Sequence, residues 1–133
     1  MRLRLVTPER QLLDAEVGEV YAPGILGQFG VLPLHVAFLT ALEPGELRYR
    51  STDEGDRYVA VSGGVCEVLD DVVTVLADTA ERAEEIDVER ARAAEERAAA
   101  LVEETSPDTP EGEDARTALA RARVRLAVAS RAA

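Results

Sequence analysis

Hydrophobic and polar residues alternate in short runs over residues 1 to about 80. Alternation with a period of two is typical of half-buried β-strands, because successive side chains point to opposite faces of a sheet. Turn signals such as Gly63-Gly64 and Asp70-Asp71 interrupt the runs, and their spacing predicts roughly eight to ten short antiparallel strands. Such a series closes into an antiparallel β-sandwich or a flattened barrel. The runs read RLRLV, GEVYA, GELRYRS, RYVAVSGGVCEVL and DVVTVLAD.

Beyond residue 80 the hydrophobic period becomes that of a helix. Asp87 is a favourable N-cap, and the pattern after it predicts a helix over about residues 88–104. The predicted contact stripe of this helix consists of Ala91, Ala94, Ala98, Leu101 and Val102.

The stretch TSPDTPEGED follows this helix, and Pro107, Pro110 and Gly112 in it are expected to interrupt helical structure. A second helix is predicted over residues 115–133, with a stripe formed by Ala115, Leu119, Ala122, Leu126 and Ala129. The chain is therefore expected to consist of a β-sandwich domain over residues 1–82 and a C-terminal α-helical hairpin over residues 83–133.

The charge of the chain narrows the classes of partner. Asp and Glu number 26 against 15 Lys and Arg, which gives a net charge of -11 and disfavours binding to nucleic acid or to anionic lipid. All of the cationic side chains are Arg, whose planar fork suits carboxylates and phosphates. The predicted second helix is an exception to the acidic composition and calls for an anionic partner, because it has no acid and carries Arg116, Arg121, Arg123, Arg125 and Arg131.

The chain lacks the usual catalytic and metal-binding patterns. It has no phosphate-binding loop and no nucleophile elbow, and a single His and a single Cys cannot form the common metal sites. His35 is interpreted as a packed or edge-strand histidine, since no orienting partner stands near it, and Cys66 as a buried small hydrophobe. We therefore expect a non-enzyme with no metal and no required cofactor. The absence of a signal peptide and of a membrane span predicts a soluble, cytoplasmic protein.

The order of several motifs resembles the epsilon subunit of the rotary F-type ATP synthase, over essentially the whole chain. The motifs are GQFGVLPLHVAFLTAL, EPGELRY and VAVSGGVCEVLDDVVTVLADTAER, followed by the arginine-bearing hairpin. The resemblance implies a non-catalytic central-stalk subunit, peripheral on the cytoplasmic face of the inner membrane, that couples proton or sodium flow to ATP synthesis. It implies that the sandwich binds the gamma subunit and the membrane rotor ring, with Gln28, Phe29 and His35 as contact residues.

The resemblance also makes the hairpin a regulatory arm. Folded, it lies against the sandwich; extended, it reaches the alpha and beta subunits and inhibits ATP hydrolysis, with Arg116 and Arg123 as contacts. Family members whose hairpin binds ATP carry Ile or Leu, Asp, two variable residues, Arg and Ala, and this chain has Ile86, Asp87, Arg90 and Ala91. Further matching positions are Glu81, Arg97, Arg121 and Arg125.

The spacing of the arginines along the two predicted helices is consistent with ATP as a regulatory ligand. Arg90 and Arg97 share a helix face, as do Arg121 and Arg125, so a folded hairpin can bring four guanidinium groups to one triphosphate. The alternative is that these arginines pair on solvated faces with acids such as Glu84, Glu95 and Glu96. Weak packing by a stripe of Ala, about one methyl per contact, favours a hairpin that can detach.

Departures from the family pattern leave other interpretations open. Leu34 and Ala37 replace a Gly and a Pro of the usual loop, and Gln28 replaces a common acid, which is expected to alter the loop turn and its rotor contact. A divergent, sodium-translocating ATPase and a free-standing nucleotide-sensing module both remain alternatives. An exposed apolar patch near Gln28 to Phe38 would argue against the free-standing module. A deep pocket at His35 with a carboxylate would indicate an enzyme.

Overall fold

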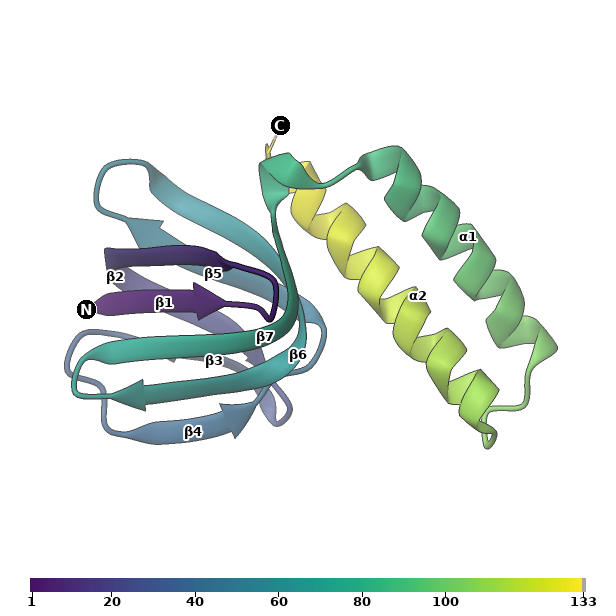
Figure 1. The fold of residues 1–133 in the computed structure, drawn as a ribbon, viewed down its shortest axis with the longest axis horizontal. Helices are drawn as coiled ribbons and strands as arrows, with labels where there is room; N and C mark the ends of the chain where they lie inside the picture. The colour runs from purple at the N-terminus through teal and green to yellow at the C-terminus, as the bar shows by residue number, and fades with distance from the viewer. Residues whose placement is uncertain (133) are drawn as a thin grey trace. The chain divides into compact units, whose positions relative to one another are not determined.

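The computed structural model describes residues 1–132, and its contacts divide the chain into two compact units. The first spans Met1–Arg82 and the second starts at Ala83. The first unit is the predicted antiparallel β-sandwich, and the second contains the predicted helical hairpin (Figure 1).

The sandwich unit consists of seven strands in the order β1-β7-β6-β5-β2-β3, with β4 paired to β6. All pairs are antiparallel except β1 with β7, and β1 also pairs with β2, so that the sheet closes on itself. The strands are β1 (Arg2–Val6), β2 (Gln11–Gly24), β3 (Gly27–Val31), β4 (Phe38–Ala41), β5 (Gly45–Ser51), β6 (Gly55–Leu69) and β7 (Val72–Arg82).

The prediction of eight to ten strands is wrong because Gly63-Gly64 does not end a strand. Both glycines lie inside the 15-residue β6, with φ of 65° and 111°, and β6 keeps one register with β7 on both sides of them. A Cβ on Gly64 would lie 2.1 Å from the carbonyl oxygen of Leu76. The glycine pair therefore allows a close approach of β6 to β7 and does not form a turn.

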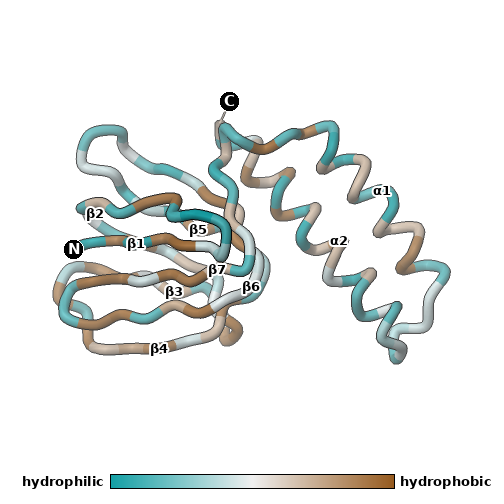
Figure 2. The backbone as a smooth tube through the Cα atoms, in the orientation of Figure 1, coloured by the Kyte–Doolittle hydropathy of each residue, from teal (hydrophilic) through white to brown (hydrophobic). Residues whose placement is uncertain are grey.

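The core of the sandwich follows the predicted alternation, which Figure 2 shows as alternating colours along the strands. Leu3 and Leu5 of β1 are fully buried, while Arg2 and Arg4, which alternate with them, are exposed. The core extends through the other strands with Val20, Val31, Leu47, Val59, Val61, Cys66, Val68, Val73 and Val75. Burial of these aliphatic side chains is the main stabilising contribution to the unit.

The hairpin unit contains η1 (Ala83–Glu85), α1 (Val88–Glu104), α2 (Pro110–Ala129) and η2 (Ser130–Ala132). The predicted bounds of the first helix are confirmed, and Asp87 caps it, since Asp87 Oδ1 accepts the Arg90 N–H at 3.1 Å. The second helix starts five residues earlier than expected, because Pro110 occupies its first turn and Thr109 caps it. Proline suits that position, where its missing N–H costs nothing.

The two helices meet through small side chains. Ala91 and Ala98 of α1 and Ala115 and Ala122 of α2 are buried, as the stripes predict. Leu101 does not join this contact and is 48% exposed. At these stripe positions the contacts are methyl-sized, worth about 0.8 kcal/mol per buried carbon, and α2 adds one larger, fully buried side chain, Val128.

Candidate functional site

The segment between β3 and β4, residues 32–37, forms an exposed apolar loop, called the 32–37 loop below. The His35 N–H donates to the Leu32 carbonyl at 3.1 Å, which closes a β-turn with Pro33 and Leu34 at its centre. Proline fixes a negative φ, and Leu34 has a φ of 65°, the combination of a type II turn. Leu34 thus adopts the left-handed conformation usually left to Gly, with its side chain 85% exposed.

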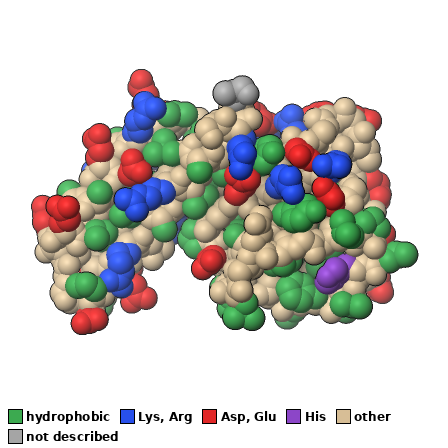
Figure 3. Space-filling view, turned by 180° about the vertical axis from the view of Figure 1, so that it is seen from behind, with side chains coloured by type: hydrophobic (Ala, Val, Ile, Leu, Met, Phe, Trp, Pro, Cys, Tyr) green, Lys and Arg blue, Asp and Glu red, His purple; other side chains and the backbone are tan. Residues whose placement is uncertain are grey.

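His35 lies in this loop and is exposed, so its interpretation as a packed or edge-strand histidine is wrong. Its Nδ1 lies 2.8 Å from the Val36 carbonyl oxygen, and its ring stands edge-on to Phe38 with centroids 6.2 Å apart. Hydrophobic side chains surround the purple histidine in Figure 3. The described contacts of His35 include no carboxylate bonded to the ring.

Gln28 and Phe29 lie in β3 and not in the loop. Gln28 is exposed, whereas the Phe29 ring is partly buried against the core and packs on Phe38, with centroids 5.0 Å apart. Phe29 is thus half-buried in the sandwich, and its contact with a partner stays a prediction. A charge placed there would be partly withdrawn from water and would destabilise the fold as well.

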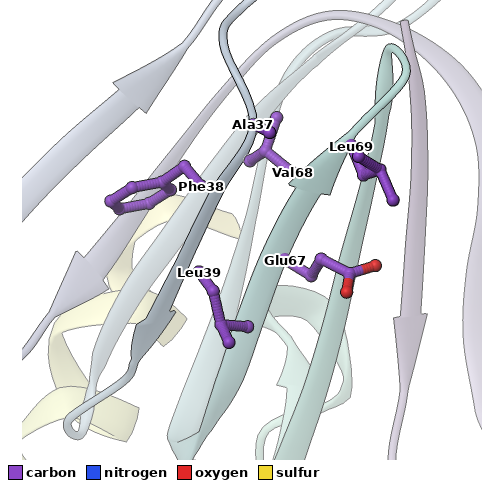
Figure 4. Close-up of a pocket in the computed structure, with 6 residues that line it drawn as sticks. All are labelled: Ala37, Phe38, Leu39, Glu67, Val68 and Leu69. Carbon is purple, nitrogen blue, oxygen red and sulfur yellow. The ribbon is translucent and has the colours of Figure 1, made fainter.

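Beside the loop, β4 and β6 enclose an open hollow of about 310 Å³ (Figure 4). Its lining is Ala37, Phe38, Leu39, Glu67, Val68 and Leu69. Glu67 is the single carboxylate of this lining, and His35 does not belong to it. The hollow is not the deep acid-base pocket at His35 that an enzyme would require.

An exposed apolar surface extends from the 32–37 loop onto β4, β6 and β7. Val36 and Leu39 are exposed, and so are Val65, Leu69 and Leu76 on the neighbouring strands. The strand pairing places Val65 opposite Leu76 and Ala41 opposite Val65, so these positions are contiguous. Leu39, Leu69 and Leu76 were not predicted from the sequence as surface residues, although the consecutive hydrophobic pair Phe38-Leu39 indicates a strand that is apolar on both faces.

In the hairpin unit, three of the four residues of the predicted ATP motif have structural roles. Ile86 is buried, Ala91 is fully buried in the contact between the helices, and Asp87 caps α1. Arg90 and Asp87 are both exposed, and Arg90 is the cationic member of the motif. The motif thus fixes the start and the packing of α1 while presenting one guanidinium group to solvent.

The other arginines fall on the same edge of the hairpin as Arg90. One residue advances a helix by about 100°, and Arg90, Arg97 and Arg121 each precede a buried alanine by one position. Because α2 runs back along α1 (Figure 1), positions preceding the contact lie on one side of the pair in both helices. Arg125, three positions after Ala122, also lies on that side and is half-buried. We call Arg90, Arg97, Arg121 and Arg125 the arginine edge.

Arg116 and Arg123 lie on the opposite edge. Arg123 directly follows the buried Ala122, and its Nε is 3.6 Å from Glu95 Oε2, so the two helices are joined on this edge. Arg116 Nη2 donates to the Pro107 carbonyl at 3.0 Å, which ties α2 to the interhelical loop. The ion pair with Glu95 is made by Arg123, a residue outside the arginine edge, while Arg121 and Arg125 of the edge have interactions of their own.

Glu81 is separate from the other ATP candidates, since it lies near the end of β7 in the sandwich unit, half-buried and paired in the sheet with Ala60. The remaining candidates belong to the hairpin unit. Within residues 1–132, no three His, Cys, Asp or Glu side chains are grouped to hold a metal ion. The helices of this described part are not long and apolar enough to cross a membrane.

Comparisons with known proteins agree with this division into units. Residues 1–83 match the family model of the ATP synthase delta/epsilon chain beta-sandwich domain, and residues 84–130 match that of its long alpha-helix domain. An ATP synthase epsilon chain of Geotalea uraniireducens is 47% identical over 133 residues, covering 100% of this chain and 96% of the relative. One of Syntrophobacter fumaroxidans is 51% identical over 131 residues, covering 98% and 96%.

Solved structures show the same architecture. A chain in the Euglena gracilis mitochondrial ATP synthase, described as OSCP/F1/c-ring, superposes with a TM-score of 0.81 and 29% identity, covering 96% of this chain and 79% of that one. A chain in the Tetrahymena thermophila central stalk and c-ring gives a TM-score of 0.64 at 20% identity and shows the fold alone. Two consecutive family models and full-length relatives establish that this chain belongs to the delta/epsilon chain family of ATP synthases.

Proposed function

We propose that this chain is a non-catalytic central-stalk subunit that couples ion flow to ATP synthesis and restrains ATP hydrolysis through its hairpin. The observation that carries the proposal is the match of both units, in order, to the two domains of the family. The subunit would be peripheral on the cytoplasmic face of the inner membrane, held there by its partners.

The sandwich would bind the gamma subunit and the rotor ring through the 32–37 loop and the adjoining apolar strands. Leu34, Val36 and Leu39 are among the most exposed aliphatic side chains of the unit. Contiguous exposed apolar side chains of this kind mark protein contact surfaces. The same surface argues against a free-standing nucleotide-sensing module, which would need no partner face.

The hairpin would sense ATP through the arginine edge. Four guanidinium groups on one side of two helices suit the oxygens of a triphosphate, and Arg forms short, bidentate bonds to such groups. Because the ligand would contact both helices, its binding would favour the folded hairpin over an extended one. The alanine contacts between α1 and α2 are methyl-sized and therefore weak. The folded and extended hairpins would then differ little in free energy, so that ATP binding would shift the population between them.

In the extended state, α2 would present Arg116, Arg121, Arg123 and Arg125 to acidic surfaces of the alpha and beta subunits. In the folded hairpin Arg123 pairs with Glu95 and Arg116 donates to the Pro107 carbonyl, and Arg121 and Arg125 have interactions as well. Extension would exchange these contacts for contacts with a catalytic subunit. The folded hairpin would therefore leave ATP hydrolysis uninhibited, and the extended hairpin would inhibit it.

Two experiments on the assembled enzyme test the proposal. A tagged chain should co-purify with the alpha, beta and gamma subunits, and its absence from such a complex would contradict the stalk assignment. Truncation after Glu104 removes α2 and should raise ATP hydrolysis at low ATP while leaving co-purification intact. Hydrolysis equal to that of the full-length complex would exclude an inhibitory hairpin.

A further inference from the structure

The turn between β6 and β7 holds an aspartate in an unfavourable backbone position. Leu69 pairs with Val72, so Asp70 and Asp71 form a two-residue hairpin loop, and their φ values are 51° and 65°. Positive φ at both residues defines a type I′ turn, whose second position strongly favours Gly. Asp71 occupies that position, so a contact of its side chain must offset the conformational cost.

Asp71 contacts the 32–37 loop at the one non-glycine residue of the loop with a positive φ. Its Oδ1 accepts the Leu34 N–H at 2.8 Å, across 37 residues of sequence. The Leu34 N–H lies at the tip of the turn from Leu32 to His35. The hydrogen bond that closes this turn is donated by the His35 N–H and not by the Leu34 N–H. A carboxylate acceptor strengthens such a bond relative to a neutral one. Two left-handed residues on different segments are thus joined directly.

We propose that Asp71 is a positioning residue for the 32–37 loop, presented by the type I′ turn so that its carboxylate holds the tip at Leu34. The bond fixes the backbone from which Leu34 and Val36 extend, and so sets the direction of the exposed apolar side chains. Its consequence for rotor binding rests on the proposed function. The positioning itself is a property of the chain alone.

The remaining contacts of Asp71 supply a matched control. Its Oδ2 lies 3.5 Å from the Met1 amino nitrogen, which lies 3.2 Å from Glu16 Oε2 as well. The Asp71 carbonyl also accepts the Arg2 N–H at 3.0 Å. Glu16→Gln changes the same charge cluster without touching Leu34, so it separates loop positioning from general electrostatics around Met1.

The test compares Asp71→Gly, Asp71→Asn and Glu16→Gln in the full chain by amide hydrogen exchange of Leu34. Gly suits the type I′ turn, so Asp71→Gly should keep or raise the melting temperature and yet speed Leu34 exchange by about tenfold. Asp71→Asn keeps a neutral acceptor and should give an intermediate rate. Glu16→Gln should leave the rate at that of the wild type.

Equal Leu34 exchange in Asp71→Gly and wild type would overturn the proposal. An equally large acceleration of Leu34 exchange in Glu16→Gln would also overturn the proposal. In that case the charges around Met1, and not the Asp71–Leu34 hydrogen bond, would control the loop. Ion pumping by the assembled enzyme distinguishes failure of the Asp71 positioning role from failure of the proposed function. Faster exchange with weakened ATP-driven ion pumping supports both, whereas faster exchange with normal pumping supports the positioning role and contradicts the rotor contact of the loop.

Discussion

Arg123 and Glu95 form an ion pair that joins the two helices, with 3.6 Å between Nε and Oε2. The side chains are 64% and 35% exposed, so water and salt screen the pair. We expect Arg123→Gln or Glu95→Gln to lower the unfolding free energy of the hairpin by at most about 1 kcal/mol. A double-mutant cycle under urea denaturation measures the coupling, and a value well above that range would show a stronger interaction than an exposed pair provides.

Gly112→Ala should destabilise the hairpin, although the same change stabilises most helices. Its Cβ would lie 2.0 Å from the Ser106 carbonyl oxygen, which belongs to the backbone of the interhelical loop and can move only with that loop. We expect a loss of about 1–3 kcal/mol instead of the usual gain of about 1 kcal/mol. Urea denaturation followed by helical circular dichroism measures it.

The exposed Ala118 on the same helix serves as the control. Ala118→Gly should cost about 1 kcal/mol by helix propensity alone. If Gly112→Ala stabilises the hairpin, the close packing of the loop on α2 is incorrect.

The sequence predicted the elements whose signals are local. Asp87 and the alanine stripe define α1, and the alternation of Leu3 and Leu5 with arginines defines β1. The predicted start of α2 is five residues late because a proline within a helical pattern indicates a helix break, although Thr109-Pro110 is a favourable N-cap followed by a first-turn proline. That signal was present in the sequence.

Contacts between distant segments could not be predicted in this way. The Gly63-Gly64 pair resembles a turn until β7 is seen to approach within contact distance. The partial burial of Phe29 depends on Phe38, which packs against it from a different strand. The arginine edge was predicted as two separate faces, and only the buried alanines of both helices place those faces on one side.

Cys66 should make the stability of the sandwich depend on pH in the alkaline range. Burial, with a smaller contribution from Glu67, raises the pKa of the Cys66 thiol to about 12 from 9.0. A raised pKa means that the unfolded chain loses its proton first, so this contribution is complete below about pH 9 and is lost as the pH rises toward 12. We expect unfolding free energies to fall less steeply over that interval in Cys66→Ala than in wild type. Parallel slopes would contradict a buried, neutral thiol.

The contribution of Asp71 to stability should depend on pH in the direction opposite to that of Cys66. The Leu34 N–H, and then the Met1 amino group, lower the pKa of the Asp71 carboxyl from 3.8, while partial desolvation opposes them. A lowered pKa means that the contribution is present above 3.8 and is lost as the pH falls through the lower folded value. The Leu34 amide proton shift, followed by NMR, should therefore change with a midpoint below 3.8. A flat profile in wild type, or an equal change in Asp71→Asn, would assign the titration elsewhere.

The most direct test of an ATP-sensing hairpin is calorimetric titration of ATP into the full chain, with variants on the two edges of α2. Arg121 belongs to the arginine edge and Arg123 to the opposite edge, two positions further along the same helix. Wild type and Arg123→Gln should bind ATP at millimolar concentration or below, and Arg121→Gln should bind about tenfold more weakly through loss of charge-assisted bonds to phosphate. No heat in wild type, or equal weakening in both variants, would contradict ATP sensing by the arginine edge.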